Sequence, residues 1–130
     1  MSLAQAPEYK EIAEKVVDKF PTAFAHIDLD QVLFIKEENK GGKNYATTRV
    51  VKEPYNFITN YKFIITVYEP LVIGMNEAQK NILILHELLH INDNFDGLIK
   101  HDTEDFEVVL SKFGLDWPTN PSVKDPLIDE

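Results

Sequence analysis

Two histidines with a glutamate between them are the residues of this chain best suited to chemistry. They form the run His86-Glu87-Leu88-Leu89-His90. In a helix, a spacing of four residues places both imidazoles on one face, one turn apart. Two such imidazoles can bind one zinc ion through ring nitrogens at about 2.0–2.1 Å. Glu87 then lies beside the metal and can take a proton from its water. The run therefore predicts a hydrolytic metal site, if the surrounding sequence forms a helix.

The residues around this run indicate a capped and buried helix. Asn76 is a good N-cap, Gln79 can complete a capping box with it, and Glu77 suits the positive end of the helix dipole. Apolar residues then occupy nearly every side: Ala78, Ile82, Ile84, Leu85, Leu88, Leu89 and Ile91. Imidazoles and a carboxylate in such a helix are costly to leave unpaired, and a metal ion would satisfy them.

Catalytic zinc usually has three protein ligands, so a third is expected downstream, where the chain can fold back. We favour His101, a residue type that zinc commonly binds; carboxylates of Asp102, Glu104 or Glu107 are the alternative. Asp102 could instead orient a ligating imidazole through a hydrogen bond, or serve as a helix N-cap. His26 lies among apolar residues and is expected to be a packing or surface residue.

The other elements predict an α+β fold with helices on one face of a small sheet of three or four strands. A helix is expected over 7–20, where apolar residues recur at helical spacing before Pro21. Strands are expected at 31–36, 45–52 and 62–68, and the Gly-rich turn at 39–44 suggests that the first two form a hairpin. A last helix is expected from Asp102 or Thr103 to Phe113, with Gly114 as its C′ residue. An irregular tail follows Trp117.

Length and composition favour one domain spanning 1–130, with residues from about 118 onward forming the tail. The chain has no cysteine, so a metal would have N and O ligands only. Its formal charge of −9 argues against a nucleic-acid partner. No apolar run reaches the roughly 18 residues of a membrane span, and no signal peptide is visible. These features favour an intracellular protein.

Several of these residues together resemble the phage metallopeptidase domain family, which is related in plan to the SprT-like zincins. The resemblance rests on the run from His86 to Ile91, on His101-Asp102-x-x-Asp105-Phe106, and on Gly114 before Trp117. Upstream it includes the Val32–Ile35 strand, the following turn and strand through Ala46, and the Phe63–Val67 strand.

This resemblance implies a zincin-like fold, a zinc site of His86, His90 and His101, and Glu87 as the catalytic residue. It also implies a phage-related or bacterial protein of the cytoplasm. The sequence departs from metzincins, whose third histidine comes six residues after the second, because that position is Asp96 here.

The expected activity is zinc-dependent hydrolysis of peptide bonds in a protein or peptide substrate, with Glu87 as general base. Strand 62–68 or a neighbour is expected to pair with the substrate. The oxyanion helper stays open among Tyr45, Tyr55, Tyr61 and Tyr68. Two alternatives are a zinc-binding phage regulatory or interaction module without catalysis, and a metallohydrolase acting on a non-peptide substrate. The sequence does not indicate an oligomeric state.

Overall fold

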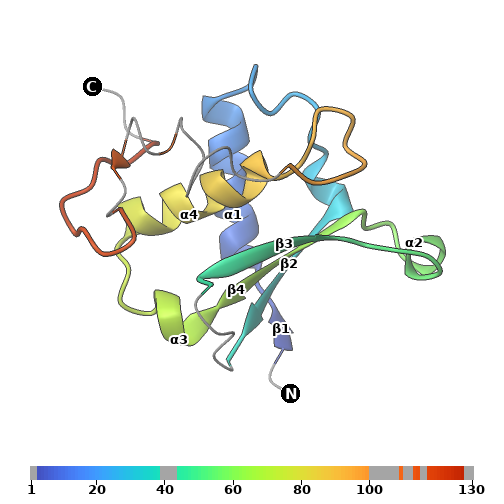
Figure 1. The fold of residues 1–130 in the computed structure, drawn as a ribbon, viewed down its shortest axis with the longest axis horizontal. Coiled ribbons are helices and arrows are strands. Elements are labelled where there is room, and N and C mark those ends of the chain that lie inside the picture. The colour runs from blue at the N-terminus through green and yellow to red at the C-terminus, as the bar shows by residue number, and fades with distance from the viewer. Residues whose placement is uncertain (1–2, 39–43, 100–108, 110–112, 115–116, 128–130) are drawn as a thin grey trace.

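A four-stranded mixed sheet with helices over one face forms the frame of the molecule (Figure 1). The computed structural model describes residues 3–38, 44–99, 109, 113, 114 and 117–127. The strands lie in the order β1-β2-β4-β3, with β2 and β4 parallel and both outer pairs antiparallel. Their bounds are Leu3–Gln5 (β1), Val32–Glu37 (β2), Ala46–Val50 (β3) and Phe63–Tyr68 (β4). The predicted α+β class is confirmed.

The predicted hairpin between the second and third of these strands is wrong, because β4 lies between them. Strands β2 and β3 lie two strand spacings apart, about 10 Å, and the eight residues between them in the sequence are enough to span that distance. The physical reason is composition: β4 reads Phe-Ile-Ile-Thr-Val-Tyr and tolerates burial, whereas β3 reads Ala-Thr-Thr-Arg-Val. The more apolar strand therefore takes the central position, and the more polar strand takes an edge.

The burial pattern of strand β4 shows which face of the sheet is covered. Phe63, Ile65 and Val67 are fully buried, and the residues between them are only half-buried. The register pairs these three with Val50, Thr48 and Ala46 of β3, so those side chains face the same layer. This layer is the one that packs against the helices, and it places Thr48 under the helix that carries Glu87.

Two helices cover this face of the sheet (Figure 1). Helix α1 spans Pro7–Lys19, as predicted, and buries Tyr9, Ala13 and Val16. Helix α4 spans Glu77–Leu89 and packs against both α1 and β3. Two single-turn helices, α2 (Tyr55–Ile58) and α3 (Glu69–Val72), and a 3₁₀ turn (Leu29–Gln31) lie in the connections.

Helix α4 begins with the predicted capping box. The Asn76 side chain accepts from the Gln79 amide at 2.9 Å, and the Gln79 side chain accepts from the Asn76 amide at 2.8 Å. From Asn81 to Leu88 every residue of the helix is buried. The prediction of a capped helix inside the core is therefore confirmed.

The predicted last helix lies mostly outside the described residues. Val109 and Phe113 are helical and buried. Gly114 has φ 84°, the left-handed conformation expected of a C′ glycine. In the described part of the chain, no helix combines the length and apolar character needed to cross a membrane.

Candidate metal centre

His86, Glu87 and His90 lie together at the C-terminal end of α4. Each offers a ligand atom, and these three atoms lie within 4.8 Å of one another. The two imidazole rings are 5.1 Å apart, edge to face. His90 is the C-cap, but its φ of −70° and ψ of −19° are still helical, so the one-turn spacing is preserved. Two imidazoles and a carboxylate are a donor set that fits a divalent metal ion such as zinc.

The protonation of the His90 ring is set by a backbone carbonyl. Its Nδ1 lies 2.7 Å from the oxygen of Ile99. A carbonyl oxygen can only accept, so Nδ1 carries the proton and Nε2 carries the lone pair that a metal would need. Histidines that bind metals in proteins are usually held by such a bond from their other nitrogen. In His90 this bond leaves Nε2 as the nitrogen that could bind a metal ion.

The loop after α4 brings that carbonyl back to the helix. The Ile99 amide donates to the His90 carbonyl at 2.6 Å, and Ile91 and Leu98 form a β-bridge. Within the loop, the Asn92 side-chain oxygen accepts from the amides of Asp96 and Gly97 at 3.0 and 3.2 Å. The turn is closed by the Asn92 amide, which donates to the Gly97 carbonyl at 3.0 Å.

Gly97 packs closely on the loop: a Cβ there would lie 3.0 Å from Asn92 Nδ2, so the Asn92 side chain would have to shift. Phe95 holds the loop to the sheet: it is 7% exposed, adopts φ 57°, and its ring lies 5.0 Å from that of Phe63. The Asn92 hydrogen bonds and the packing of Phe95 therefore both fix the loop, and this keeps the Ile99 carbonyl in place.

Glu87 is held by a residue that the sequence reasoning missed. Thr48 Oγ1 donates to Glu87 Oε1 at 2.8 Å and also lies 3.2 Å from the Glu87 backbone oxygen. The other carboxylate oxygen, Oε2, is 3.8 Å from His86 Nε2. Glu87 is 3% exposed. Thr48 could have been found only from the register of β3 against β4, since nothing local in the sequence marks it.

The C-terminal tail covers the His86 side of the helix. Trp117 is buried, and its ring centre lies 6.3 Å from that of His86. Gln79 donates to the carbonyls of Trp117 and Pro118 at 3.4 and 3.1 Å. Asn81 donates to Asp125 at 2.9 Å. The tail is thus tied to α4 by side chains of the helix itself.

The sequence offers four candidates for the third ligand, and His26 and Asp96 are not among them. His101, Asp102, Glu104 and Glu107 lie outside the described residues. His26 lies within them and contacts the Ile91 carbonyl at 3.3 Å through Nε2, as expected for a packing residue. Asp96, at the metzincin position, accepts from Asn92 at 2.9 Å and is absent from the one metal-capable group among the described residues.

Two of the four tyrosines considered as oxyanion helpers lie where that role is difficult. Tyr68 alternates with the buried residues of β4, so its side chain lies on the face of the sheet opposite α4. Tyr55, on α2, is 65% exposed. Tyr45 packs partly against the core beside β3, and Tyr61 lies just before β4.

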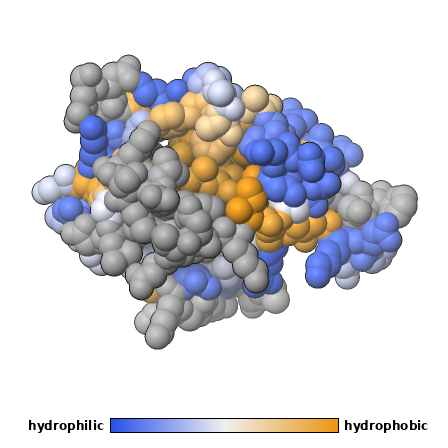
Figure 2. Space-filling model, turned by 45° about the horizontal axis from the view of Figure 1, so that its top comes forward, coloured by the Kyte–Doolittle hydropathy of each residue, from blue (hydrophilic) through white to orange (hydrophobic). Residues whose placement is uncertain are grey.

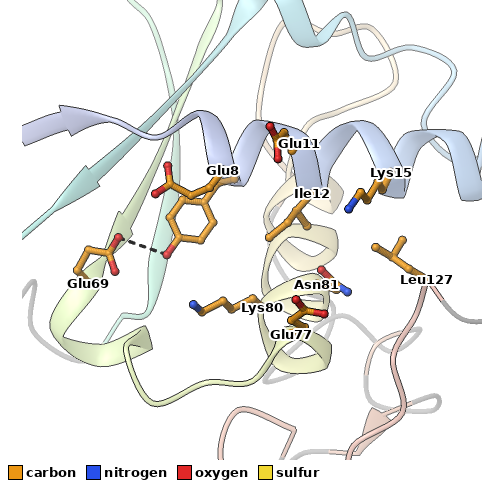
Figure 3. A pocket seen from close by; sticks show the side chains of 10 residues that line it. Glu8, Glu11, Ile12, Lys15, Glu69, Glu77, Lys80, Asn81 and Leu127 are labelled. Carbon is orange, nitrogen blue, oxygen red and sulfur yellow. Dashed lines mark hydrogen bonds between the residues drawn. The ribbon is translucent and has the colours of Figure 1, made fainter.

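A pocket of about 450 Å³ lies at the other end of α4, between α1, α3 and the tail. Charges of both signs line it: Glu11 and Lys15 from α1 face Glu77 and Lys80 from α4 (Figure 3). At its edge, Tyr9 donates to Glu69 at 3.4 Å. Burial, and then the nearby carboxylates of Glu69 and Glu8, raise the pKa of the Tyr9 phenol. Among the described residues, no histidine lines this pocket.

The surface beside His90 is partly apolar. Leu98 and Ile99, in the returning loop, are 45% and 41% exposed although both are large apolar residues. On the face shown in Figure 2, apolar residues gather in a central region with hydrophilic residues at either side. Two exposed apolar side chains therefore lie in the loop that returns to His90.

Comparison with known proteins adds a family to this geometry. No curated protein and no solved structure gives a significant match to the chain. A family model described as "Putative phage metallopeptidase" matches residues 1–125, nearly the whole sequence. The chain therefore belongs to this family.

Proposed function

We propose that this protein is a zinc-dependent peptidase with Glu87 as its general base. The observation that carries the proposal is the buried Glu87 carboxylate, whose Oε2 lies 3.8 Å from Nε2 of His86, one turn before His90. A buried carboxylate beside two imidazoles is costly unless a positive charge compensates it. A divalent ion held by His86 and His90 would supply that charge. The family assignment supports the same chemistry.

His101 is proposed as the third ligand. Ile99 is bonded to His90 at both its amide and its carbonyl. The covalent chain keeps the Cα of a residue two positions later within about 7 Å of the Ile99 Cα. This short connection to a residue that contacts His90 supports His101 as the third ligand. Asp102 remains proposed as a hydrogen-bond partner that orients the His101 ring.

The zinc ion, when bound, would lower the pKa of its water to about 7 and polarise the scissile carbonyl. The residues of the chain transfer the proton, orient the ligand and exclude water. Glu87 accepts the proton of the attacking water and passes it to the departing amine. His90 keeps its Nε2 lone pair toward the site because Ile99 holds the proton on Nδ1. The loop, the tail and the sheet shield Glu87 from bulk solvent, which strengthens these interactions.

Strand β3 is proposed to bind the substrate as an added strand. It replaces β4 in this role, since β4 is paired on both sides, whereas among the described residues nothing pairs with the outer edge of β3. The bonds Tyr68 N–Tyr45 O and Val51 N–Lys62 O fix which residues bond inward. In an antiparallel ladder the alternate residues point their amides and carbonyls outward. These are Ala46, Thr48 and Val50, and Thr48 lies beside Glu87.

The proposed partner is therefore a peptide or protein segment in extended conformation. Main-chain bonds to β3 would give affinity without strong sequence preference, and side-chain contacts would add specificity. The net charge of −9 gives no support for a nucleic-acid substrate.

The test is a peptide-cleavage screen with the zinc-loaded protein, wild type against Glu87→Gln. The wild type should cleave peptides and lose activity when a chelator removes the metal. Glu87→Gln should bind the same amount of zinc and lose about 10²–10⁴-fold in kcat, because the amide cannot accept the proton. Glu77→Gln, an exposed acid at the other end of the same helix, is the matched control and should keep full activity. Full hydrolysis by Glu87→Gln would reject the proposed base.

A further inference from the structure

Glu87 has two roles open to it at this site, and only one of them is catalysis. A carboxylate can be a zinc ligand, with oxygen at about 2.0–2.2 Å from the metal, or it can stand back and act as a base. One of its oxygens belongs to a set of ligand atoms that all lie within 4.8 Å of one another. Nothing in the spacing of H-E-x-x-H alone prevents Glu87 from joining the metal as a third ligand.

Thr48 restrains that carboxylate from the sheet. Its hydroxyl is 2.8 Å from Oε1, whereas the other carboxylate oxygen, Oε2, lies 3.8 Å from Nε2 of His86. Because Glu87 is 3% exposed, the Thr48 hydroxyl takes the place that a water would occupy at an exposed carboxylate. A hydrogen bond to one oxygen fixes the rotation of the carboxylate about its last side-chain bond. It also opposes a movement toward the metal, because that movement would break the bond in a buried setting.

Strand β3 is held firmly in place at Thr48. Thr48 lies at the middle of β3, paired with Ile65 of β4, which is fully buried. The Thr48 hydroxyl also lies 3.2 Å from the backbone oxygen of Glu87, so strand and helix are joined at this point. The packing of β3 in the core therefore fixes the position of the Thr48 hydroxyl.

We propose that Thr48 is a positioning residue that keeps the Glu87 carboxylate off the metal and available as the base. This inference rests on the proposed function, and it deepens it by assigning a role to a residue outside the H-E-x-x-H run. It also links the metal-binding residues to the proposed substrate-binding edge, since the main-chain N–H and C=O of Thr48 point toward that edge of β3.

Three variants of β3 test this. Thr48→Val keeps the shape and removes the donor, and Thr48→Ser keeps the donor. Thr47→Val is the control on the same strand: Thr47 faces the other side of the sheet, and no hydrogen-bond partner of its hydroxyl is found among the described residues. Each variant is loaded with Co²⁺, whose visible absorption reports coordination number, and its kcat and KM for peptide cleavage are measured.

In Thr48→Val the cobalt spectrum should change toward a higher coordination number as Glu87 joins the metal. Its kcat should fall by about 10- to 100-fold, while KM changes little. Thr48→Ser and Thr47→Val should match the wild type in both measurements. Adding Glu87→Gln to Thr48→Val should remove the spectral change, because the carboxylate is then gone.

A Thr48→Val protein with the wild-type spectrum and kcat would overturn the inference. If the wild type cleaves no peptide, the proposed function fails, and the spectra alone decide the role of Thr48. A cobalt spectrum that changes in Thr48→Val, but not in Thr48→Ser or in the double variant, supports the positioning role of Thr48. An unchanged spectrum in Thr48→Val overturns that role. If Thr48→Val disturbs folding, shown by a lowered melting temperature, Thr48→Ala is measured in the same way, and the same two spectral results decide.

Discussion

The two ends of helix α4 differ in how their polar residues are held. At the N-terminal end, Glu77 and Lys80 line a pocket of about 450 Å³ with charged residues of α1 (Figure 3). At the C-terminal end, His86 and Glu87 are buried, and His90 is half-buried. The N-terminal end therefore has a large pocket. The C-terminal end has side chains that could bind a metal ion, and neighbouring residues hold them in fixed orientations.

This difference shows why pocket size is a poor guide to chemistry here. The pocket side chains are long, charged and of both signs, so they can pair with one another and with water. At the other end, the Ile99 carbonyl fixes His90 and the Thr48 hydroxyl fixes Glu87. A site that must hold an ion and a base in one geometry needs bonds of the second kind.

The largest expected effect is the loss of metal on removing a histidine from the C-terminal end. His86→Ala and His90→Ala should each weaken zinc binding by more than the roughly 10- to 100-fold typical of changes around a metal site. The proposed ligand His101 should behave in the same way. Isothermal titration with zinc measures this, with Lys80→Ala at the pocket end as the control. If Lys80→Ala lost metal as well, the distinction between the two ends would be broken.

An intermediate effect is expected from the loop that orients His90. Asn92→Ala removes the acceptor of the Asp96 and Gly97 amides, so the Ile99 carbonyl is held less firmly. Zinc affinity should fall by about 10- to 100-fold although no ligand is changed. Competition with a chromophoric chelator gives the affinity. An unchanged affinity with a clearly lowered melting temperature would mean that the loop stabilises the fold without orienting His90.

The smallest effect should come from the N-terminal end, and it should appear in stability alone. Asn76→Ala removes one half of the capping box and a bond to the Pro121 carbonyl at 2.9 Å. The free energy of unfolding should fall by about 1 kcal/mol. Denaturant unfolding measures it, and zinc affinity of the same variant should match the wild type. A large loss of affinity would show that the two ends are coupled.

The sequence predicted local features of the fold better than it predicted strand order. The capping box, helix α1 and strand β4 follow from neighbours within a few residues, and all three are confirmed. The pairing of β2 with β4 depends on which strand tolerates burial on both faces, and the turn at 39–44 suggested the wrong partner. Strand β1, three exposed residues long, carries no pattern that marks it as a strand.

The candidate site divides in the same way. His86, Glu87 and His90 could be found because their spacing is helical and local. Thr48 and the Ile99 carbonyl could not, since one depends on strand register and the other on the path of a loop. The third ligand, predicted as His101, stays a prediction because it lies outside the described residues.

The most direct measurement of the central claim is zinc X-ray absorption on the protein loaded with one equivalent of the metal. We expect imidazole nitrogens at about 2.0–2.1 Å from zinc, and loss of this signal in a His86→Ala/His90→Ala double variant. Wild-type protein that binds no zinc, or a spectrum that is the same in the double variant, would contradict the account.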